Sequence, residues 1–246
     1  MRLGRALVTG AGARLGKAMA EALGADGWSV GVHYRTSRAG AEATAAAIVA
    51  SGGEAALLQA DLSNSDETET LVARAAEALG GPVTLLVNSA STFVNDTAIG
   101  HSRADWDFHM EPNLRAPVHL AQTFAQALPD GEKGLIVNIV DARVWNLTPD
   151  YFTYTLSKAG LWAATQTLAR ALAPNIRVNA IGPGPTLQNV HQDEAGFEAD
   201  KAATLTGEGS SPAEIVNALR YLVSASSVTG QMIASDGGEH LMWPEG

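Results

Sequence analysis

An α/β fold is predicted for this chain, with a doubly wound parallel sheet of about seven strands and helices on both faces. Two observations predict it. Short apolar runs that suit buried strands alternate along the whole chain with longer segments of helical periodicity. A glycine-rich turn also follows the first strand-like run and leads directly into a helix-like segment. The 246 residues contain no linker and no internal repeat, so we expect a single domain over residues 1–246.

The individual elements follow from local patterns. Leu15, Met19 and Leu23 recur at helical spacing after the first strand, and Ser211 with Pro212 combines an N-cap with proline at the first helical position. Because helices separate the strands, parallel pairing with right-handed crossovers is expected. Strands are predicted at residues 6–9, 29–33, 55–59, 84–87, 135–140, 176–180 and 232–234, and helices at 15–23, 39–49, 66–79, 113–128, 153–172 and 212–223.

Composition limits the classes of partner. The formal net charge of −10 argues against nucleic acid or an anionic membrane as the main partner, and a small-molecule substrate is expected instead. The absence of cysteine excludes disulfides and metal thiolates, and the six histidines lack metal-ligand spacing, so no metal site is predicted. The first strand begins close to Met1, and no apolar run approaches the ~18 residues of a membrane span, so we expect a cytoplasmic protein without a signal peptide.

The turn after the first strand has the features of a phosphate-binding loop. Gly10, Gly12 and Gly16 permit a tight turn, a close approach of the backbone to a pyrophosphate, and close packing of the following helix, which begins near Leu15. The free N–H groups at that helix start would face the phosphates. A dinucleotide cofactor is therefore predicted at this turn.

The segment after the second strand indicates which dinucleotide binds. It reads His33, Tyr34, Arg35, Thr36, Ser37, Arg38, without the carboxylate that would hold both ribose hydroxyls of NAD. Guanidinium and hydroxyl groups can instead hold a ribose 2′-phosphate, and Arg14 in the glycine loop would add a further positive charge. NADPH is the predicted cofactor; the alternative is that these arginines are solvated side chains beside a turn.

Tyr154 and Lys158 form a pair that could donate protons. A spacing of four residues places both on one face of the predicted helix at 153–172. A free phenol titrates near ~10, and a nearby ammonium would lower its pKa toward the working range. The alternative is an ordinary tyrosine and lysine on a surface helix.

Taken with Asn88, Ser89, Ala90 and Ser91 after the fourth strand, these motifs make the chain resemble the short-chain dehydrogenase/reductase family over essentially its whole length. The resemblance implies a Rossmann fold, a homotetramer with contact faces near Asn113 and Thr153, and further site residues. In addition to the residues above, it implies cofactor contacts at Asp61, Leu62, Asn88, Ser89, Ala90, Lys158, Pro183 and Gly184, and a catalytic water relay at Asn113. Alternatives remain for two of them: an N-cap at Asp61, Ser63 or Ser65, and a contact of Asn113 with a backbone carbonyl.

One position departs from the family pattern. Asp141 stands where the family usually has a catalytic serine, and together with Arg14 and Phe93 it resembles the pteridine reductase branch, which includes dihydromonapterin and dihydrofolate reductases. The resemblance implies that Phe93 stacks a pterin against the nicotinamide, and that Ser91 and Arg14 contact ligand or cofactor phosphate. Trp145 is a further candidate for the substrate side, with core packing as its alternative.

Residues 182–211 break the regular pattern and are predicted to form a substrate lid with a short helix near 194–205. Leu187 would close on a flat ring, unless the segment is a disordered surface loop.

These observations lead to one preferred function. We expect an NADPH-dependent reductase that transfers a hydride to the C=N bond of a reduced pterin or dihydrofolate, with Tyr154, Lys158, Asp141 and Asn113 as catalytic residues and with Arg14, Ser91, Phe93, Asp141, Tyr154, Trp145 and Leu187 around the substrate. A carbonyl or 3-oxoacyl reductase of the same family and a non-catalytic NADP-binding regulator are the alternatives.

Overall fold

The computed structural model describes residues 3–189 and 192–242, and in this part of the chain seven parallel strands form one sheet in the order β3-β2-β1-β4-β5-β6-β7. The predicted fold class is confirmed. The strands are β1 Gly4–Val8, β2 Trp28–Tyr34, β3 Glu54–Gln59, β4 Leu85–Asn88, β5 Gly134–Ile139, β6 Ile176–Pro183 and β7 Met232–Ser235.

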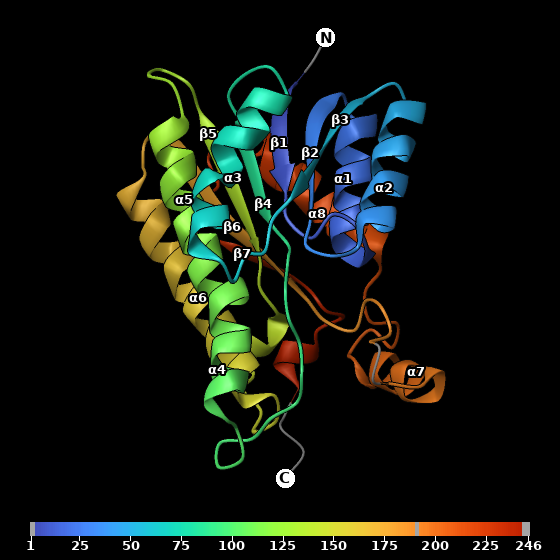
Figure 1. Cartoon of the computed structure of the whole chain (residues 1–246). Helices are drawn as coiled ribbons and strands as arrows, with labels where there is room; N and C mark the ends of the chain where they lie inside the picture. Colours follow the sequence, from blue (N-terminus) through green and yellow to red (C-terminus); the bar gives the residue numbers. More distant parts are fainter. Residues whose placement is uncertain (1–2, 190–191, 243–246) are drawn as a thin grey trace.

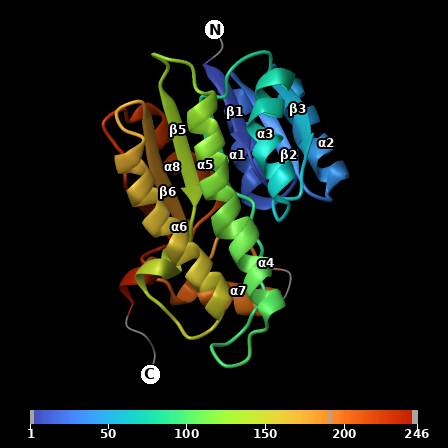
Figure 2. The same cartoon turned by 60° about the vertical axis from the view of Figure 1, so that its left-hand side comes forward.

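Helices cover both faces of this sheet (Figure 1). One face carries α1 Arg14–Ala25, α2 Arg38–Ala50 and α8 Pro212–Ser224; the other carries α3 Ser65–Ala78, α5 Ala116–Ala127 and α6 Phe152–Ala171, which come forward in Figure 2. Adjacent β-strand residues point to opposite faces, so Val8 belongs to the apolar core under α1 and α8, and Leu7 to the core under α3 and α5.

The helix predicted to begin at Asn113 begins ten residues earlier. A capping box at Ser102 and Asp105 starts α4 Arg103–Met110, and a single π-turn at Glu111–Arg115 joins it to α5. The sequence prediction missed α4 because this helix extends past the edge of the sheet, where His109 is its only fully buried side chain.

The strand order reverses between β1 and β4, and this reversal opens a crevice beyond the carboxyl ends of both strands. Two later elements also lie at the carboxyl ends of the strands. They are α7 Glu194–Ala203, which stands apart from the main body in Figure 1, and the 3₁₀ turn η3 Glu239–Leu241 after β7. Within the described part of the chain, no helix is both long enough and apolar enough to cross a membrane.

Candidate active site

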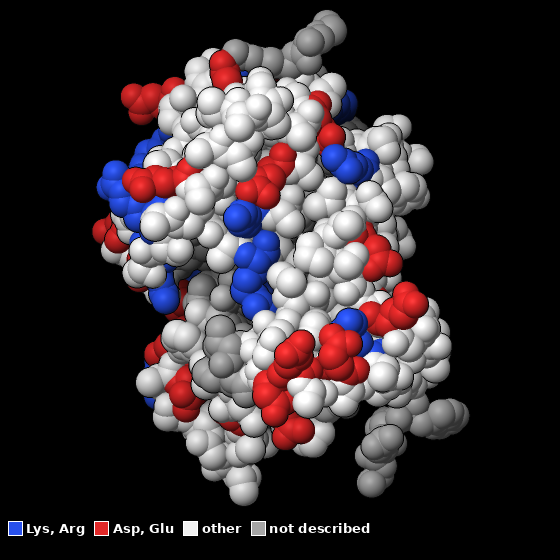
Figure 3. All heavy atoms as spheres, turned by 90° about the vertical axis from the view of Figure 1, so that its right-hand side faces the viewer, with Lys and Arg blue, Asp and Glu red and all other residues white. Residues whose placement is uncertain are grey.

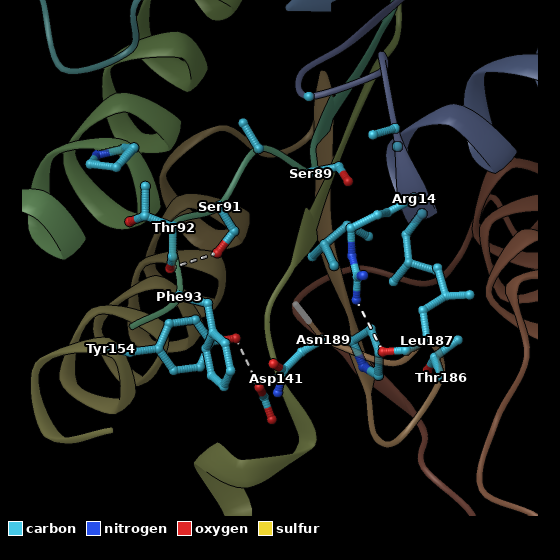
Figure 4. Close-up of a pocket in the computed structure, with 18 of the residues that line it drawn as sticks. Arg14, Ser89, Ser91, Thr92, Phe93, Asp141, Tyr154, Thr186, Leu187 and Asn189 are labelled. Atoms are coloured by element: carbon cyan, nitrogen blue, oxygen red, sulfur yellow. Dashed lines mark hydrogen bonds between the residues drawn. The ribbon is translucent and has the colours of Figure 1, made fainter. Parts of the chain in front are cut away.

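A cavity of about 840 Å³ lies at the carboxyl ends of the strands and collects most of the predicted site residues. It is lined from the α1 side by the glycine loop and from the α6 side by Tyr154 and Lys158 (Figure 4). The predicted residues in its wall are Gly10, Gly12, Arg14, Leu15, Gly16, His33, Tyr34, Arg35, Ser37, Asp61, Leu62, Ser89, Ala90, Ser91, Phe93, Asp141, Tyr154, Lys158, Pro183, Gly184 and Leu187. Four predicted residues lie outside this lining: Arg38, Asn88, Asn113 and Trp145.

The glycine loop is shaped by close backbone contacts. Gly10 has φ +66°, and a Cβ on Gly16 would lie 2.3 Å from the carbonyl oxygen of Gly10. The loop is also tied to β2, because the N–H of Gly10 donates to Nδ1 of His33 at 3.0 Å while Nε2 of His33 donates to the Ala60 carbonyl at 3.1 Å. Burial lowers the pKa of His33 to about 4, so its ring is neutral at pH 7 and its Nδ1 accepts the loop hydrogen bond.

The residues predicted to select the 2′-phosphate separate into two groups. Arg35 and Ser37 line the cavity, and Ser37 makes no side-chain cap to α2, so its hydroxyl is not used to start that helix. Arg38 lies outside the lining, where its Nε donates to Glu42 on the exposed side of α2 at 2.8 Å. Arg35 is therefore the arginine after β2 that faces the cavity.

Arg14 lies in the cavity wall, but its guanidinium has a different partner from the one predicted. Nη1 donates to the Gln188 carbonyl at 2.7 Å and Nη2 to the Leu187 carbonyl at 3.0 Å, so the side chain links α1 to the segment after β6 (Figure 4). Its φ of 50° is in the left-handed region, which is uncommon for a residue with a Cβ. Arg14 thus holds the segment that is predicted to form a lid, and its contribution to the phosphate site stays a prediction.

Asp61 and Leu62 line the cavity after β3. The N-cap alternative for Asp61 does not hold, because Asn64 caps α3 by accepting from the N–H of Asp66. The Asp61 carboxylate accepts instead from the N–H of Ser63 at 2.9 Å and closes an Asx turn.

Asn88 is predicted to contact the cofactor, but it is buried, with 3% exposure, and does not line the cavity. Its Nδ2 donates to Oδ1 of Asn138 at 2.9 Å, and Asn138 in turn donates to Thr165, so the pair joins β4, β5 and α6. The cavity wall above it is formed by Ser89 and Ala90, whose N–H groups both donate to the hydroxyl of Thr9.

Tyr154 and Asp141 are in direct contact. The phenol donates to Oδ2 of Asp141 at 2.8 Å (Figure 4), while Oδ1 of Asp141 accepts from the N–H of Arg143 at 2.9 Å. Burial raises the pKa of Tyr154 well above its usual value, and the negative charge of Asp141 and the hydrogen bond to it raise it further.

The predicted lowering of the Tyr154 pKa by Lys158 is therefore corrected. The ammonium lies 5.7 Å from the centre of the Tyr154 ring and donates to the Ile139 carbonyl at 2.9 Å. Burial and the adjacent carboxylate raise the Tyr154 pKa by more than the charge of Arg143 lowers it. Burial also lowers the pKa of Lys158 itself, to about 8, against the opposite effect of Asp141.

Asn113, predicted to hold a water relay, is fully buried in the π-turn and contacts protein groups. Its Oδ1 accepts from the N–H of Thr92 at 2.8 Å, and its Nδ2 donates to the Thr92 carbonyl at 3.0 Å and to Ser157 at 3.2 Å. The alternative of a backbone contact thus describes this side chain. Its position fixes the segment that carries Phe93.

Phe93 lies in the cavity wall within an aromatic group. Its ring stacks on Tyr151 with centres 4.3 Å apart and meets the Tyr154 ring edge-on at 4.7 Å. The N–H of Val94 donates to Nε2 of His109, whose Nδ1 donates to Thr153, which hydrogen-bonds Asp96. These contacts hold the Phe93 ring beside the phenol.

Trp145, predicted to flank the substrate, packs elsewhere. It belongs to the 3₁₀ turn η2 Ala142–Trp145 and meets Trp162 edge-on at 6.1 Å and His240 at 5.0 Å. Trp145 lies outside the cavity lining, and because it is 42% exposed, its core-packing alternative does not describe it either.

The sequence analysis missed several residues of the cavity wall, among them Arg143, Tyr151, Asp200 and Glu239. Glu239 had a usable signal, since Gly237 and Gly238 mark a turn directly after the last strand, at the edge where ligands bind in this fold. No comparable signal marks Tyr151, whose φ of 53° is seen only in the structure.

A doubly wound sheet with a glycine loop at its first turn and a buried tyrosine and lysine at its carboxyl edge is the arrangement of a dinucleotide-dependent oxidoreductase. Comparisons with known proteins agree with this class. A family model described as enoyl-(acyl carrier protein) reductase matches residues 10–240. The 3-oxoacyl-[acyl-carrier-protein] reductase of Synechocystis sp. is 31% identical over 237 residues, which are 95% of each chain.

Two solved structures are more similar. FolM alternative dihydrofolate reductase 1 from Brucella canis, in complex with NADP, has a TM-score of 0.95 at 45% identity and covers 99% of this chain and 96% of its own. Its counterpart from Brucella suis, also in complex with NADP, has the same TM-score and identity and covers 99% and 97%.

This chain belongs to the short-chain dehydrogenase/reductase family. Its resemblance to the pteridine and dihydrofolate reductase branch is confirmed by the two Brucella structures, and both contain the form of cofactor that the sequence predicts.

Proposed function

We propose that this protein is an NADPH-dependent reductase that transfers a hydride to the C=N bond of a reduced pterin or dihydrofolate. The observation that carries the proposal is the hydrogen bond from Tyr154 to Asp141 beside Phe93, where most of the family has a serine. An aspartate in contact with the phenol suits proton delivery to a ring nitrogen better than stabilisation of a carbonyl oxygen.

The residues present fit this cofactor. The glycine loop leaves a cradle that a side chain would fill, as the 2.3 Å between a Cβ on Gly16 and the Gly10 oxygen illustrates. Arg35 and Ser37 would hold the 2′-phosphate, and Lys158 would hold the nicotinamide ribose. The cofactor, when bound, supplies the hydride.

The chain's own residues would handle the proton and the substrate ring. Burial and the Asp141 charge keep the Tyr154 phenol protonated at neutral pH, so it can serve as the acid that protonates the ring nitrogen. Asp141 would then take a proton from solvent and pass it to the Tyr154 phenolate through their hydrogen bond, which restores the phenol. The exposed face of the Phe93 group would position the flat ring, with Leu187 and the rest of segment 182–211 closing over it as a lid. Residues 190 and 191 of that lid lie outside the described residues.

The alternative within the family is a carbonyl or 3-oxoacyl reductase, and the Synechocystis relative favours it. Tyr154 and Lys158 would serve that reaction equally, with Asp141 in place of serine. A non-catalytic NADP-binding regulator is less well supported, because it gives no role to the buried contact of Tyr154 with Asp141.

One kinetic experiment separates these functions. NADPH oxidation is followed with 7,8-dihydropterins, dihydrofolate, a 3-oxoacyl thioester and simple ketones. Turnover of the C=N substrates with at least a hundredfold higher kcat/KM than the carbonyl substrates supports the proposal, and the reverse order supports the alternative. No turnover of any substrate, with NADPH still bound, would support the regulator.

The predicted homotetramer belongs to this proposal as well. Apolar side chains are partly exposed along α4 to α6, including Trp106 (38% exposed), Phe108 (40%) and Leu156 (37%), near the faces predicted from Asn113 and Thr153. Light scattering on the purified protein tests it, with a mass near four times 25.5 kDa as the expected result. The cytoplasmic location stays a prediction.

A further inference from the structure

Glu239 occupies a fixed position in the cavity wall that the proposed reaction does not use. It is the first residue of η3, and the buried carboxylate of Asp236 holds this turn by accepting from the N–H of Gly238 at 3.0 Å, the N–H of His240 at 2.9 Å and Nδ1 of His240 at 2.6 Å. Asn146 also donates to the Met242 carbonyl at 3.1 Å. These contacts fix η3 against the segment that follows Asp141.

The side chain of Glu239 reaches the cavity wall beside Gly184. A Cβ built on Gly184 would lie 2.8 Å from Oε2 of Glu239 and 2.6 Å from Cβ of Asp236. The contact with Asp236 requires glycine at position 184, and it holds the backbone that carries Glu239 close to β6.

The Glu239 carboxylate has free acceptor capacity. Each oxygen of Asp141, by contrast, already accepts one hydrogen bond, from Tyr154 and from the N–H of Arg143. Among the described residues no donor hydrogen-bonds the Glu239 side chain; the nearby Arg143 donates instead to Thr148 and to the Asp150 carbonyl and lies over the Tyr151 ring.

The surroundings of Glu239 are negative on balance. Burial is the first cause that raises its pKa, to about 7, and the charges of Asp141, Asp236 and Asp200 raise it further, whereas Arg143 lowers it. Asp200 comes from α7, which also carries Glu194 and Glu198. Figure 3 shows acidic side chains gathered on the lower half of the face where Figure 1 places α7.

The chemistry of the proposed substrates places their side chain at this end. In a 7,8-dihydropterin the reacting bond is N5=C6: the hydride goes to C6 and the proton to N5. The side chain is attached to C6 itself, so it leaves the ring beside the groups that protonate N5, which are Tyr154 and Asp141. Glu239 and Asp141 line the same cavity, and the charge of Asp141 acts on the Glu239 carboxyl, so a ring protonated by Tyr154 would direct its side chain toward this end of the cavity.

We propose, on the basis of the proposed function, that Glu239 is a specificity residue that faces the substituent on C6 and disfavours substrates whose substituent is anionic. Neutral, hydroxylated dihydropterins can donate hydrogen bonds to this carboxylate. Dihydrofolate, whose tail ends in two carboxylates, is repelled by it.

The test compares kcat/KM for 6-hydroxymethyl-7,8-dihydropterin, dihydropteroate and dihydrofolate, which carry tails with zero, one and two carboxylates. Glu239→Gln keeps the shape and one acceptor, and it should raise kcat/KM on dihydrofolate about tenfold through a lower KM, with less effect on dihydropteroate and a change under threefold on the neutral substrate. Glu77→Gln, which removes an exposed carboxylate on α3, is the matched control and should change none of the ratios.

A pH comparison gives a second readout. In the wild type, the preference for the neutral substrate over dihydrofolate should grow between pH 6 and pH 8 as Glu239 ionises, and it should be flat in Glu239→Gln. Effects of Asp141 and Tyr154 on the chemical step apply to both substrates and cancel in the ratio.

The outcomes separate the two claims. An unchanged ratio in a folded Glu239→Gln protein, with dihydropterins still reduced, overturns this inference and leaves the proposed function intact. If the wild type reduces no dihydropterin at all, the proposed function fails and the role of Glu239 fails with it.

Discussion

The phenol oxygen of Tyr154 lies 2.8 Å from Oδ2 of Asp141, and this contact gives the active site an acid that retains its proton at neutral pH. Asp141→Asn removes the negative charge that helps to raise the Tyr154 pKa, so that pKa should fall. The alkaline limb of the pH profile of kcat should then move to lower pH. The value of kcat on a dihydropterin should fall about a hundredfold, because the amide cannot pass solvent protons to the phenol. NADPH affinity should stay within about twofold.

The control for this prediction is Asp150→Asn, which removes an exposed carboxylate from the loop before α6. Asp141→Ser tests the same contact from the other side, since it restores the residue usual in the family and should lose pterin reduction while gaining weak ketone reduction. Full pterin turnover in either Asp141 variant would falsify the role given to this carboxylate.

The lowered pKa of His33 predicts that the protein is less stable in acid. This pKa is about 4 in the folded protein against 6.5 for the free side chain, so below pH 6.5 the unfolded chain binds a proton that the folded chain does not. The free energy of unfolding should therefore decrease as pH falls from about 6.5 to about 4, by roughly 3 kcal/mol from this residue. Urea unfolding at pH 5 and pH 7.5 measures the effect.

In the His33→Gln variant, the free energy of unfolding should differ less between pH 5 and pH 7.5 than it does in the wild type. The difference should not vanish, because burial also lowers the pKa of His109, which acts in the same direction. His119→Gln, on α5 and away from the cavity, is the control variant. If the free energy of unfolding of His33→Gln changed with pH as much as that of the wild type, His33 would not be a source of the acid sensitivity.

Arg35 should determine the choice between the two nicotinamide cofactors. Arg35→Ala removes a charge-assisted contact with the 2′-phosphate, worth about 1.5–3 kcal/mol, so the Kd for NADPH should rise roughly 10- to 100-fold while the Kd for NADH changes little. Arg38→Ala is the matched control, because Arg38 pairs with Glu42 outside the cavity lining. Titrations of both cofactors decide the question, and equal losses for NADPH and NADH would count against a 2′-phosphate contact.

Phe93 should act on the substrate and not on the cofactor. Phe93→Ala removes an aromatic wall, and stacking adds on the order of 1 kcal/mol to the burial, so KM for a dihydropterin should rise about tenfold with the NADPH Kd nearly unchanged. Phe93→Leu keeps much of the apolar area without the stacking and should give a smaller rise. A thermal melt accompanies the kinetics: a large drop in Tm with equal losses for both ligands would assign Phe93 to the core instead.

Much of this site could be predicted from the sequence because its residues follow strands. Gly10, Asp61, Ser89 and Asp141 each stand directly or closely after a strand, and parallel strands bring such positions to one edge. The direction of the Tyr154 pKa could not be predicted. It depends on burial and on a contact between two residues 13 positions apart in the sequence, and the spacing of Tyr154 and Lys158 encodes neither.

The contact partners of several functional side chains could not be predicted from the sequence either. Arg14, Asn113 and Trp145 have the chemistry to contact a ligand, yet the structure uses them for a lid contact, a backbone clamp and packing against His240. A residue type states what a side chain can bind, whereas the fold determines which of the possible partners lies within reach. α4 was missed for a related reason, since a helix that buries only one side chain leaves little periodicity to detect.

The two hydrogen bonds from Arg14 to the carbonyls of Leu187 and Gln188 have a consequence for the order of events in a catalytic cycle. Arg14 is the first residue of α1, at whose N-terminus the dinucleotide is proposed to bind, and the same side chain holds the segment proposed as the substrate lid. The proposed placement puts the dinucleotide against the glycine loop and the substrate outside it, so a substrate that bound first would block the entry of the cofactor. Steady-state kinetics should accordingly be sequential and ordered, with the dinucleotide first to arrive and last to depart.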